Sequence, residues 1–249
     1  MAEYRDIPDM SKQLEKNLKR LPLILCEDIS GSMMSKCELM NEQLYKFFSM
    51  KSIEPEVSKR TDIEIIKFND EIFGPIKSTL SSYNFVPFEI ENMSGTTHLW
   101  GALDKALSSC EKYFNNTSYW APWILLYTDG FDNDEPANLK EEVKAKLQAY
   151  EKENKIILFI LGIGDKDGNI EELDTNELNS ISKHGSRVVL YTLNQELDIS
   201  CFFQFMMKTI TKTISGTEFF ARNHDGTYAL RIERIYEAYE ESKKLRSIF

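Results

Sequence analysis

The hydrophobic positions of the chain fall into short apolar runs separated by longer stretches with helical spacing. Apolar or isoleucine-rich runs bounded by polar residues are typical of strands that are covered on both faces of a parallel sheet. We expect such strands at residues 21–25, 61–69, 123–128, 155–164 and 187–193.

Between these runs, apolar residues recur every three or four positions, which predicts amphipathic helices. We expect helices over residues 36–50, 99–110, 139–150, 172–183 and 199–214. Strands that alternate with helices predict an α/β domain, with a mostly parallel central sheet and helices on both of its faces.

One hairpin interrupts this alternation. Asn69-Asp70 is a turn signal, and the sequence EIFGPIKS that follows predicts a strand antiparallel to residues 61–69. Pro75 within this run indicates an edge strand, because proline donates no hydrogen bond to a neighbouring strand. We expect residues 187–193 to form the last strand of the chain.

The pattern divides the 249 residues into three parts. Residues 1–20 are a polar lead-in, residues 21–215 form the α/β domain, and residues 216–249 are a C-terminal extension. The extension begins with aromatic residues and continues through a turn at Asp225-Gly226 into a helix of mixed charge. The domain is long enough to bury a sizeable core.

Charge and cysteine content exclude several classes of function. Forty acidic residues against thirty basic ones give a net charge of -10, which disfavours a nucleic-acid partner and suits a cation site. The four cysteines form no CxxC pair, so neither a disulfide framework nor a zinc site is expected. No apolar stretch is long enough for a membrane span, and we expect a cytoplasmic protein.

The candidate chemistry begins where the first strand ends, in LPLILCEDISGSM (residues 21–33). Asp28, Ser30 and Ser32 place one carboxylate and two hydroxyls at every second position. The carboxyl ends of strands are where open α/β sheets bind ligands, and such oxygen atoms suit Mg²⁺. The alternative is a serine-rich turn that caps the next helix.

Two further loops carry oxygen-bearing side chains. Thr96 and Thr97 follow Gly95 and precede a helix, where a capping role is again the alternative. Asp129 follows the buried run WILLYT directly, so it is expected at the same edge of the sheet as Asp28. Asp165, Asp167 and Asn169 resemble a calcium loop only loosely, and we interpret them as a solvated turn.

Taken together, these loops resemble the von Willebrand factor A (vWA) domain family over roughly residues 20–215. The family has a three-layer Rossmann-like fold and a metal-ion-dependent adhesion site built from a DxSxS loop, a threonine loop and a later aspartate. Asp28, Ser30 and Ser32 match the first part, and Asp129 matches the last. Thr97 is the better match for the threonine, because Thr96 then takes the place of the usual second glycine.

The resemblance implies a mechanism. Ser30 and Ser32 would bind the metal directly, Asp28 and Asp129 would act from the second shell, and Thr97 would bind directly or through water. The metal is expected to be Mg²⁺, with Mn²⁺ or Ca²⁺ as alternatives. The last ligand would be an Asp or Glu of a partner protein, and Asp28→Ala or Asp129→Ala would abolish partner binding while leaving the fold largely intact.

Within the family, the chain resembles the intracellular bacterial proteins of the TerY type, which are linked to tellurite resistance and stress. The LPLILCEDISGSM stretch and the sequence FFQF at 202–205 carry this finer resemblance. A subunit that couples an ATPase or a kinase–phosphatase pair to a target is an alternative. An enzyme such as a magnesium-dependent phosphoryl hydrolase is less favoured, because His98, His184 and His224 lie in unrelated places and no phosphate-binding glycine-rich loop occurs.

Overall fold

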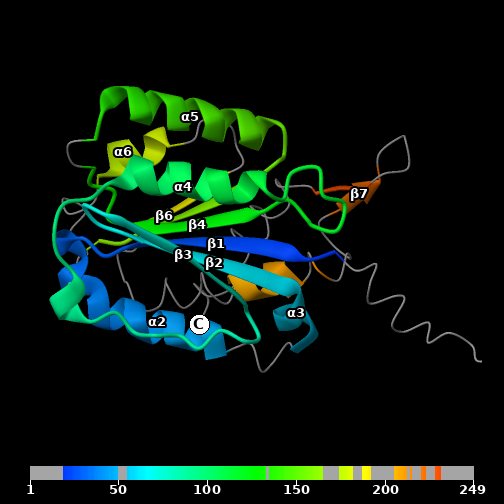
Figure 1. Cartoon of the computed structure of the whole chain (residues 1–249), viewed down its shortest axis with the longest axis horizontal. Coiled ribbons are helices and arrows are strands. Elements are labelled where there is room, and N and C mark those ends of the chain that lie inside the picture. Colours follow the sequence, from blue (N-terminus) through cyan, green and yellow to red (C-terminus); the bar gives the residue numbers. More distant parts are fainter. Residues whose placement is uncertain are drawn as a thin grey trace, which may run out of the picture.

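Six strands form the central sheet in the order β3-β2-β1-β4-β5-β6 (Figure 1). The strands are β1 (Leu21–Asp28), β2 (Thr61–Phe68), β3 (Ile72–Thr79), β4 (Trp123–Thr128), β5 (Ile157–Gly162) and β6 (Arg187–Tyr191). All neighbouring pairs are parallel except β2 with β3, which is antiparallel. The predicted α/β fold, with one antiparallel edge strand, is therefore confirmed.

The structure is a computed structural model. It describes residues 19–49, 55–132, 135–164, 174–181, 187–191, 205–211, 214, 220–222 and 228–230. The helices with defined bounds are η1 (Gly31–Lys36), α2 (Cys37–Ser49), α3 (Pro55–Arg60), η3 (Ile90–Asn92), α4 (Leu99–Glu111), α5 (Ala137–Lys152) and α6 (Thr175–Ser180). Residues 205–211 are also helical. Within these ranges, none of the helices is both long and apolar enough to cross a bilayer.

Helices cover both faces of the sheet, with α4, α5 and α6 on one face and α2 on the other (Figure 1). The alternation of side chains along β1 explains its continuous apolar run. Leu23 and Leu25 pack in the core under α2, whereas Ile24 and Cys26 pack in the core under α4 and α5. Each face of the strand therefore removes apolar surface from water.

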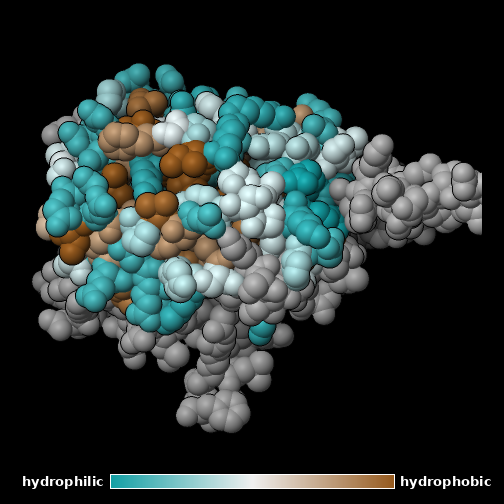
Figure 2. All heavy atoms as spheres, turned by 60° about the horizontal axis from the view of Figure 1, so that its bottom comes forward, coloured by the Kyte–Doolittle hydropathy of each residue, from teal (hydrophilic) through white to brown (hydrophobic). Residues whose placement is uncertain are grey.

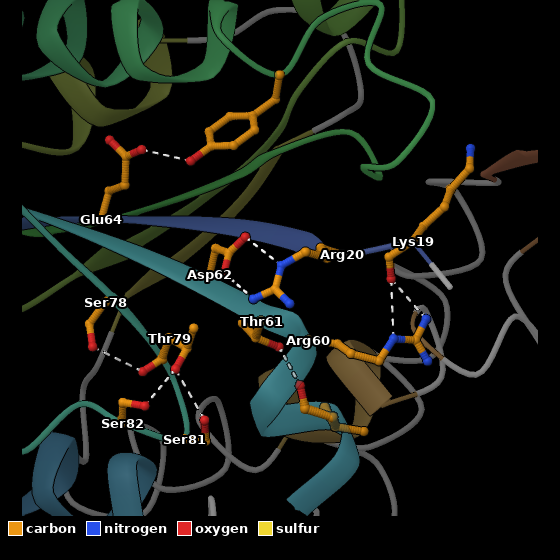
Figure 3. A network of polar contacts seen from close by, with 12 residues as sticks. Lys19, Arg20, Arg60, Thr61, Asp62, Glu64, Ser78, Thr79, Ser81 and Ser82 are labelled. Atoms are coloured by element: carbon orange, nitrogen blue, oxygen red, sulfur yellow. Dashed lines mark hydrogen bonds and ion pairs between the residues drawn. The ribbon is translucent and has the colours of Figure 1, made fainter. Parts of the chain in front are cut away.

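The amino ends of β1 and β2 are tied together by a polar network (Figure 3). Asp62 accepts two hydrogen bonds from the guanidinium of Arg20, and these raise the pKa of Arg20. The guanidinium of Arg60 donates to the carbonyl oxygen of Lys19, and the Thr61 hydroxyl donates to that of Val57. These contacts lie at the amino end of the sheet, opposite the end where Asp28 lies.

The expectation that residues 187–193 form the last strand is wrong. A separate two-stranded antiparallel sheet joins β7 (Phe220–Arg222) to β8 (Tyr228–Leu230). Aromatic residues favour strands, and the Asp225-Gly226 turn signal between the two segments is typical of hairpins. The predicted helix of the extension and the lead-in before residue 19 lie outside the described residues, as do parts of the helix predicted at 199–214. The boundaries of the three predicted parts stay predictions.

Candidate metal centre

The site forms where two central strands end side by side. Parallel pairing aligns Glu27 of β1 with Tyr127 of β4, so Asp28 and Thr128 end their strands at the same level. Asp129 follows at once. The backbone pairing therefore brings the two predicted aspartates to one edge of the sheet, as the sequence indicated.

Asp28 is buried and fixed by two hydrogen bonds. Its Oδ1 atom accepts from the backbone N–H of Ser30 at 2.9 Å, and its Oδ2 atom accepts from the hydroxyl of Thr128. Burial, and then the neighbouring charge of Asp129, raise the pKa of Asp28 to about 7. Two carboxylates in so apolar a place repel each other, and a cation between or beside them would relieve that repulsion.

The two serines lie together beside these carboxylates. Their Oγ atoms are 3.1 Å apart. Ser30 is buried, whereas Ser32 is exposed. The site is therefore closed towards the sheet and open to solvent on the Ser32 side, where a ligand from outside can approach.

The threonine segment lies against the serine loop. Gly31 donates its N–H to the carbonyl oxygen of Gly95 at 3.2 Å, and Ser94 donates to that of Ile29 at 3.2 Å. Gly95 has a φ of +79°, a backbone conformation that favours glycine. Thr97 is buried and Thr96 is exposed; the choice of Thr97 as the ligand stays a prediction.

Both helix-capping alternatives are wrong. Ser30 is the residue before η1 and His98 the residue before α4, and neither side chain makes a capping hydrogen bond. Instead, the Glu135 carboxylate accepts hydrogen bonds from the backbone N–H groups of Trp100 and Gly101, with N···O distances of 2.5 and 2.7 Å. The serines and threonines are consequently available for another role.

Lys36 is a functional residue that the sequence reasoning missed. Its side chain is 2% exposed, and its Nζ atom donates to Asp129 Oδ2 at 3.1 Å and to the Ser32 carbonyl oxygen at 3.2 Å. The available signal was a lysine between the apolar residues Met33 and Cys37, at the start of the helix predicted over residues 36–50. Thr128 was also missed, although it is the polar last residue of an otherwise apolar strand.

The buried ammonium of Lys36 shows that the site accommodates positive charge. The grouped side chains are two carboxylates and hydroxyls, all oxygen donors, which fits a hard divalent cation. In the described part of the chain, no group of three or more His, Cys, Asp or Glu side chains could hold a metal ion. Carboxylates alone therefore do not suffice, and hydroxyls would have to complete the ligand set.

The remaining candidates do not join this site as far as the structure describes them. His98 is half-buried, and its backbone N–H donates to the carbonyl oxygen of Asn69. His184, His224 and the predicted turn at 165–169 lie outside the described residues.

A mostly parallel sheet with oxygen-bearing side chains at the carboxyl ends of its central strands defines the class: an open α/β domain, a fold in which ligands commonly bind at that edge. The chain belongs to the von Willebrand factor type A domain family, whose sequence pattern it matches over residues 23–204. No match was found among curated protein sequences.

Solved structures support the same fold. The pilus adhesin SpaC from Lactobacillus rhamnosus GG superposes with a TM-score of 0.57 at 11% identity, covering 80% of this chain and 31% of that one. Proximal thread matrix protein 1 from the mussel byssus gives 0.53 at 18%, covering 77% and 48%. BatB from Bacteroides thetaiotaomicron gives 0.51 at 16%, covering 77% and 99%. The chain thus spans about a third to a half of the first two proteins, and these identities establish the fold alone.

Proposed function

We propose that this chain is a metal-dependent protein-binding module, not an enzyme. The observation that carries the proposal is the pair of buried aspartates, Asp28 and Asp129, beside the serine hydroxyls, with Ser32 exposed at the surface. In this proposal the site is the metal-ion-dependent adhesion site that the sequence pattern indicates, and Mg²⁺ is its default metal.

Each side chain then has a role. Ser30 and Ser32 hold the metal directly, and Thr97 holds it directly or through water. Asp28 and Asp129 balance its charge and orient the hydroxyls and waters from behind, as such carboxylates commonly do. When bound, the metal supplies an electrophilic coordination position for one more anionic oxygen.

That oxygen would come from an Asp or Glu of a partner protein, which can approach only from the solvent side of Ser32. A pilus adhesin and a minor pilin, PilB from Streptococcus sanguinis, share the fold, which is compatible with an interaction role here. We further propose a TerY-like role in a bacterial tellurite-resistance or stress system, in the cytoplasm, which rests on the sequence resemblance. A subunit that couples an ATPase or a kinase–phosphatase pair to a target differs only in the identity of the partner.

The test is affinity capture on immobilised protein. Partners from the source cells are bound in millimolar Mg²⁺ and eluted with EDTA, beside columns of Ser32→Ala and Ser35→Ala. Ser35 is an exposed serine of the same helix η1 and serves as the matched control. The proposal expects proteins that EDTA elutes from the wild type and Ser35→Ala but not from Ser32→Ala. An identical set of eluted proteins from all three columns would overturn it.

A further inference from the structure

A groove borders the candidate metal centre. It encloses about 660 Å³, within the range of ligand pockets in proteins. One wall is the turn between β2 and β3 with the start of β3, and the other is the segment 86–94. We call it the acidic groove, and it is lined by Ile29, Lys67, Phe73 and residues 69–71, 86–89 and 91–94.

The acidic groove adjoins two loops of the metal centre. Ile29 directly precedes the candidate ligand Ser30, and the N–H of Ser94 donates to the Ile29 carbonyl oxygen at 3.2 Å. Ser94 in turn directly precedes Gly95 of the threonine segment. An extended chain with one residue at the metal can therefore place its neighbouring residues in the groove.

The walls of the groove combine exposed apolar side chains with carboxylates. Phe73 is 44% exposed and Val86 is 63% exposed, so both offer apolar surface to a ligand in the groove. Of the seven exposed large hydrophobic residues in the described chain, Phe73 and Val86 line the groove. In Figure 2, hydrophobic residues gather among hydrophilic ones on the left of the molecule. The carboxyl ends of the strands lie on the same side in Figure 1.

The charge of the groove is one-sided. Its four carboxylates, all on exposed residues, are Asp70, Glu71, Glu89 and Glu91. The single basic residue of the lining, Lys67, has its ammonium over the ring of Phe88, 4.6 Å from the ring centre. The rim of the groove thus carries a net negative charge, which attracts basic groups and repels phosphates.

We propose that the acidic groove binds the residues next to the partner's metal-binding carboxylate, and that these are an apolar side chain followed by Lys or Arg. The occupant is an extended segment of another protein, with its acidic residue at the metal, its apolar side chain against Phe73 and Val86, and its basic side chain at the glutamates. This inference rests on the proposed function, and it adds the sequence class that the site selects.

The test uses random peptides displayed on phage and selected on the full chain in millimolar Mg²⁺. Selected peptides are then synthesised, and their dissociation constants are measured on three proteins with and without EDTA. Glu89→Lys/Glu91→Lys reverses the groove charge, and Glu141→Lys/Glu142→Lys makes the same change at exposed positions of α5, on the opposite face of the sheet. Thermal unfolding checks that both variants fold like the wild type.

The proposal expects the selected peptides to combine an acidic residue with an apolar residue and Lys or Arg. The groove variant should weaken their binding about tenfold, which corresponds to roughly 1.4 kcal/mol, and the α5 variant should leave it unchanged. Failure to select any peptide that binds, peptides without basic residues, or equal binding to the groove variant and the wild type would overturn it.

EDTA separates the two proposals. Binding that EDTA abolishes but the groove variant retains would support the metal-dependent function and overturn the groove assignment. Binding that persists in EDTA but is lost in the groove variant would support the groove and contradict the metal-dependent function.

Discussion

Replacing Lys36 by methionine removes the ammonium that lies against Asp129 and keeps an unbranched side chain of similar length. In the wild type, the Lys36 and Asp129 side chains are 2% and 0% exposed, with 3.1 Å between Nζ and Oδ2. The variant leaves Asp129 buried beside Asp28 without a positive partner. We therefore expect Lys36→Met to be strongly destabilised when no divalent metal is present.

The magnitude follows from the burial of the pair. Breaking a buried ion pair by removing one partner costs about 3–5 kcal/mol. For a domain of this size, 1 kcal/mol shifts Tm by about 2–4 °C, so the variant should melt roughly 6–20 °C lower in EDTA. Lys59→Met, which breaks an exposed pair with Glu56, is the control and should cost about 0–1 kcal/mol.

Mg²⁺ should restore much of this loss. An ammonium held by the same carboxylate as a bound cation would repel that cation, since two unit charges about 4 Å apart interact by about 4 kcal/mol at an effective dielectric constant of 20. The wild type must overcome this repulsion or move Lys36 away. We expect Lys36→Met to bind Mg²⁺ at least about tenfold more tightly, equivalent to roughly 1.4 kcal/mol.

Differential scanning fluorimetry in EDTA and in Mg²⁺, together with isothermal titration calorimetry, measures both effects. An unchanged Tm in EDTA would refute the buried ion pair. A destabilised variant that binds Mg²⁺ no more tightly than the wild type would refute the competition between Lys36 and the metal.

Two further predictions concern groups outside the metal ligands. Burial raises the pKa of Glu27 from 4.5 to about 7. Between these two pH values the folded protein keeps a proton on this carboxyl that the unfolded chain releases. The free energy of unfolding therefore falls as pH rises from about 4.5 to 7. In urea unfolding at pH 8, Glu27→Gln should therefore be more stable than the wild type by up to about 3 kcal/mol, whereas at pH 4 the two should differ little. An equal difference in stability at both pH values would contradict this. Arg20→Ala should lower stability by roughly 1–3 kcal/mol through loss of the Asp62 pair. It should leave the Mg²⁺-dependent Tm shift intact, since Arg20 lies at the amino end of the sheet. Loss of that shift would show that the two ends of the sheet are coupled.

Much of the fold was predictable because the strand signals were strong. The strands β1, β4 and β5 are apolar over most of their length, since both faces of each strand are covered, and Pro75 marked β3 as the edge. The hairpin of β7 and β8 was missed because its strands are only three residues long, too short for a clear periodic pattern.

The candidate site was predictable only in part. Asp28 and Asp129 lie close together because β1 and β4 are neighbours in the sheet. Each aspartate follows an apolar run, and this position in the sequence predicted that both lie at the carboxyl edge of the sheet. Lys36 was not predictable in this way, because its contact with Asp129 joins residues 93 positions apart and depends on where helix η1 turns. The contact also changes one expectation: Asp129→Ala would leave a buried ammonium unpaired, so this variant is expected to lose stability as well as binding.

The most direct test of the central claim is thermal unfolding of the wild type, Ser32→Ala and Ser35→Ala, each in EDTA and in millimolar Mg²⁺. A ligand that binds only the folded state, at about 100 times its Kd, stabilises it by about 2.7 kcal/mol, which here corresponds to roughly 5–10 °C. We predict such a rise in Tm for the wild type and for Ser35→Ala, and a much smaller one for Ser32→Ala. A Tm that does not respond to Mg²⁺ in the wild type, or that rises equally in all three proteins, would contradict a metal centre at Asp28, Ser30, Ser32 and Asp129.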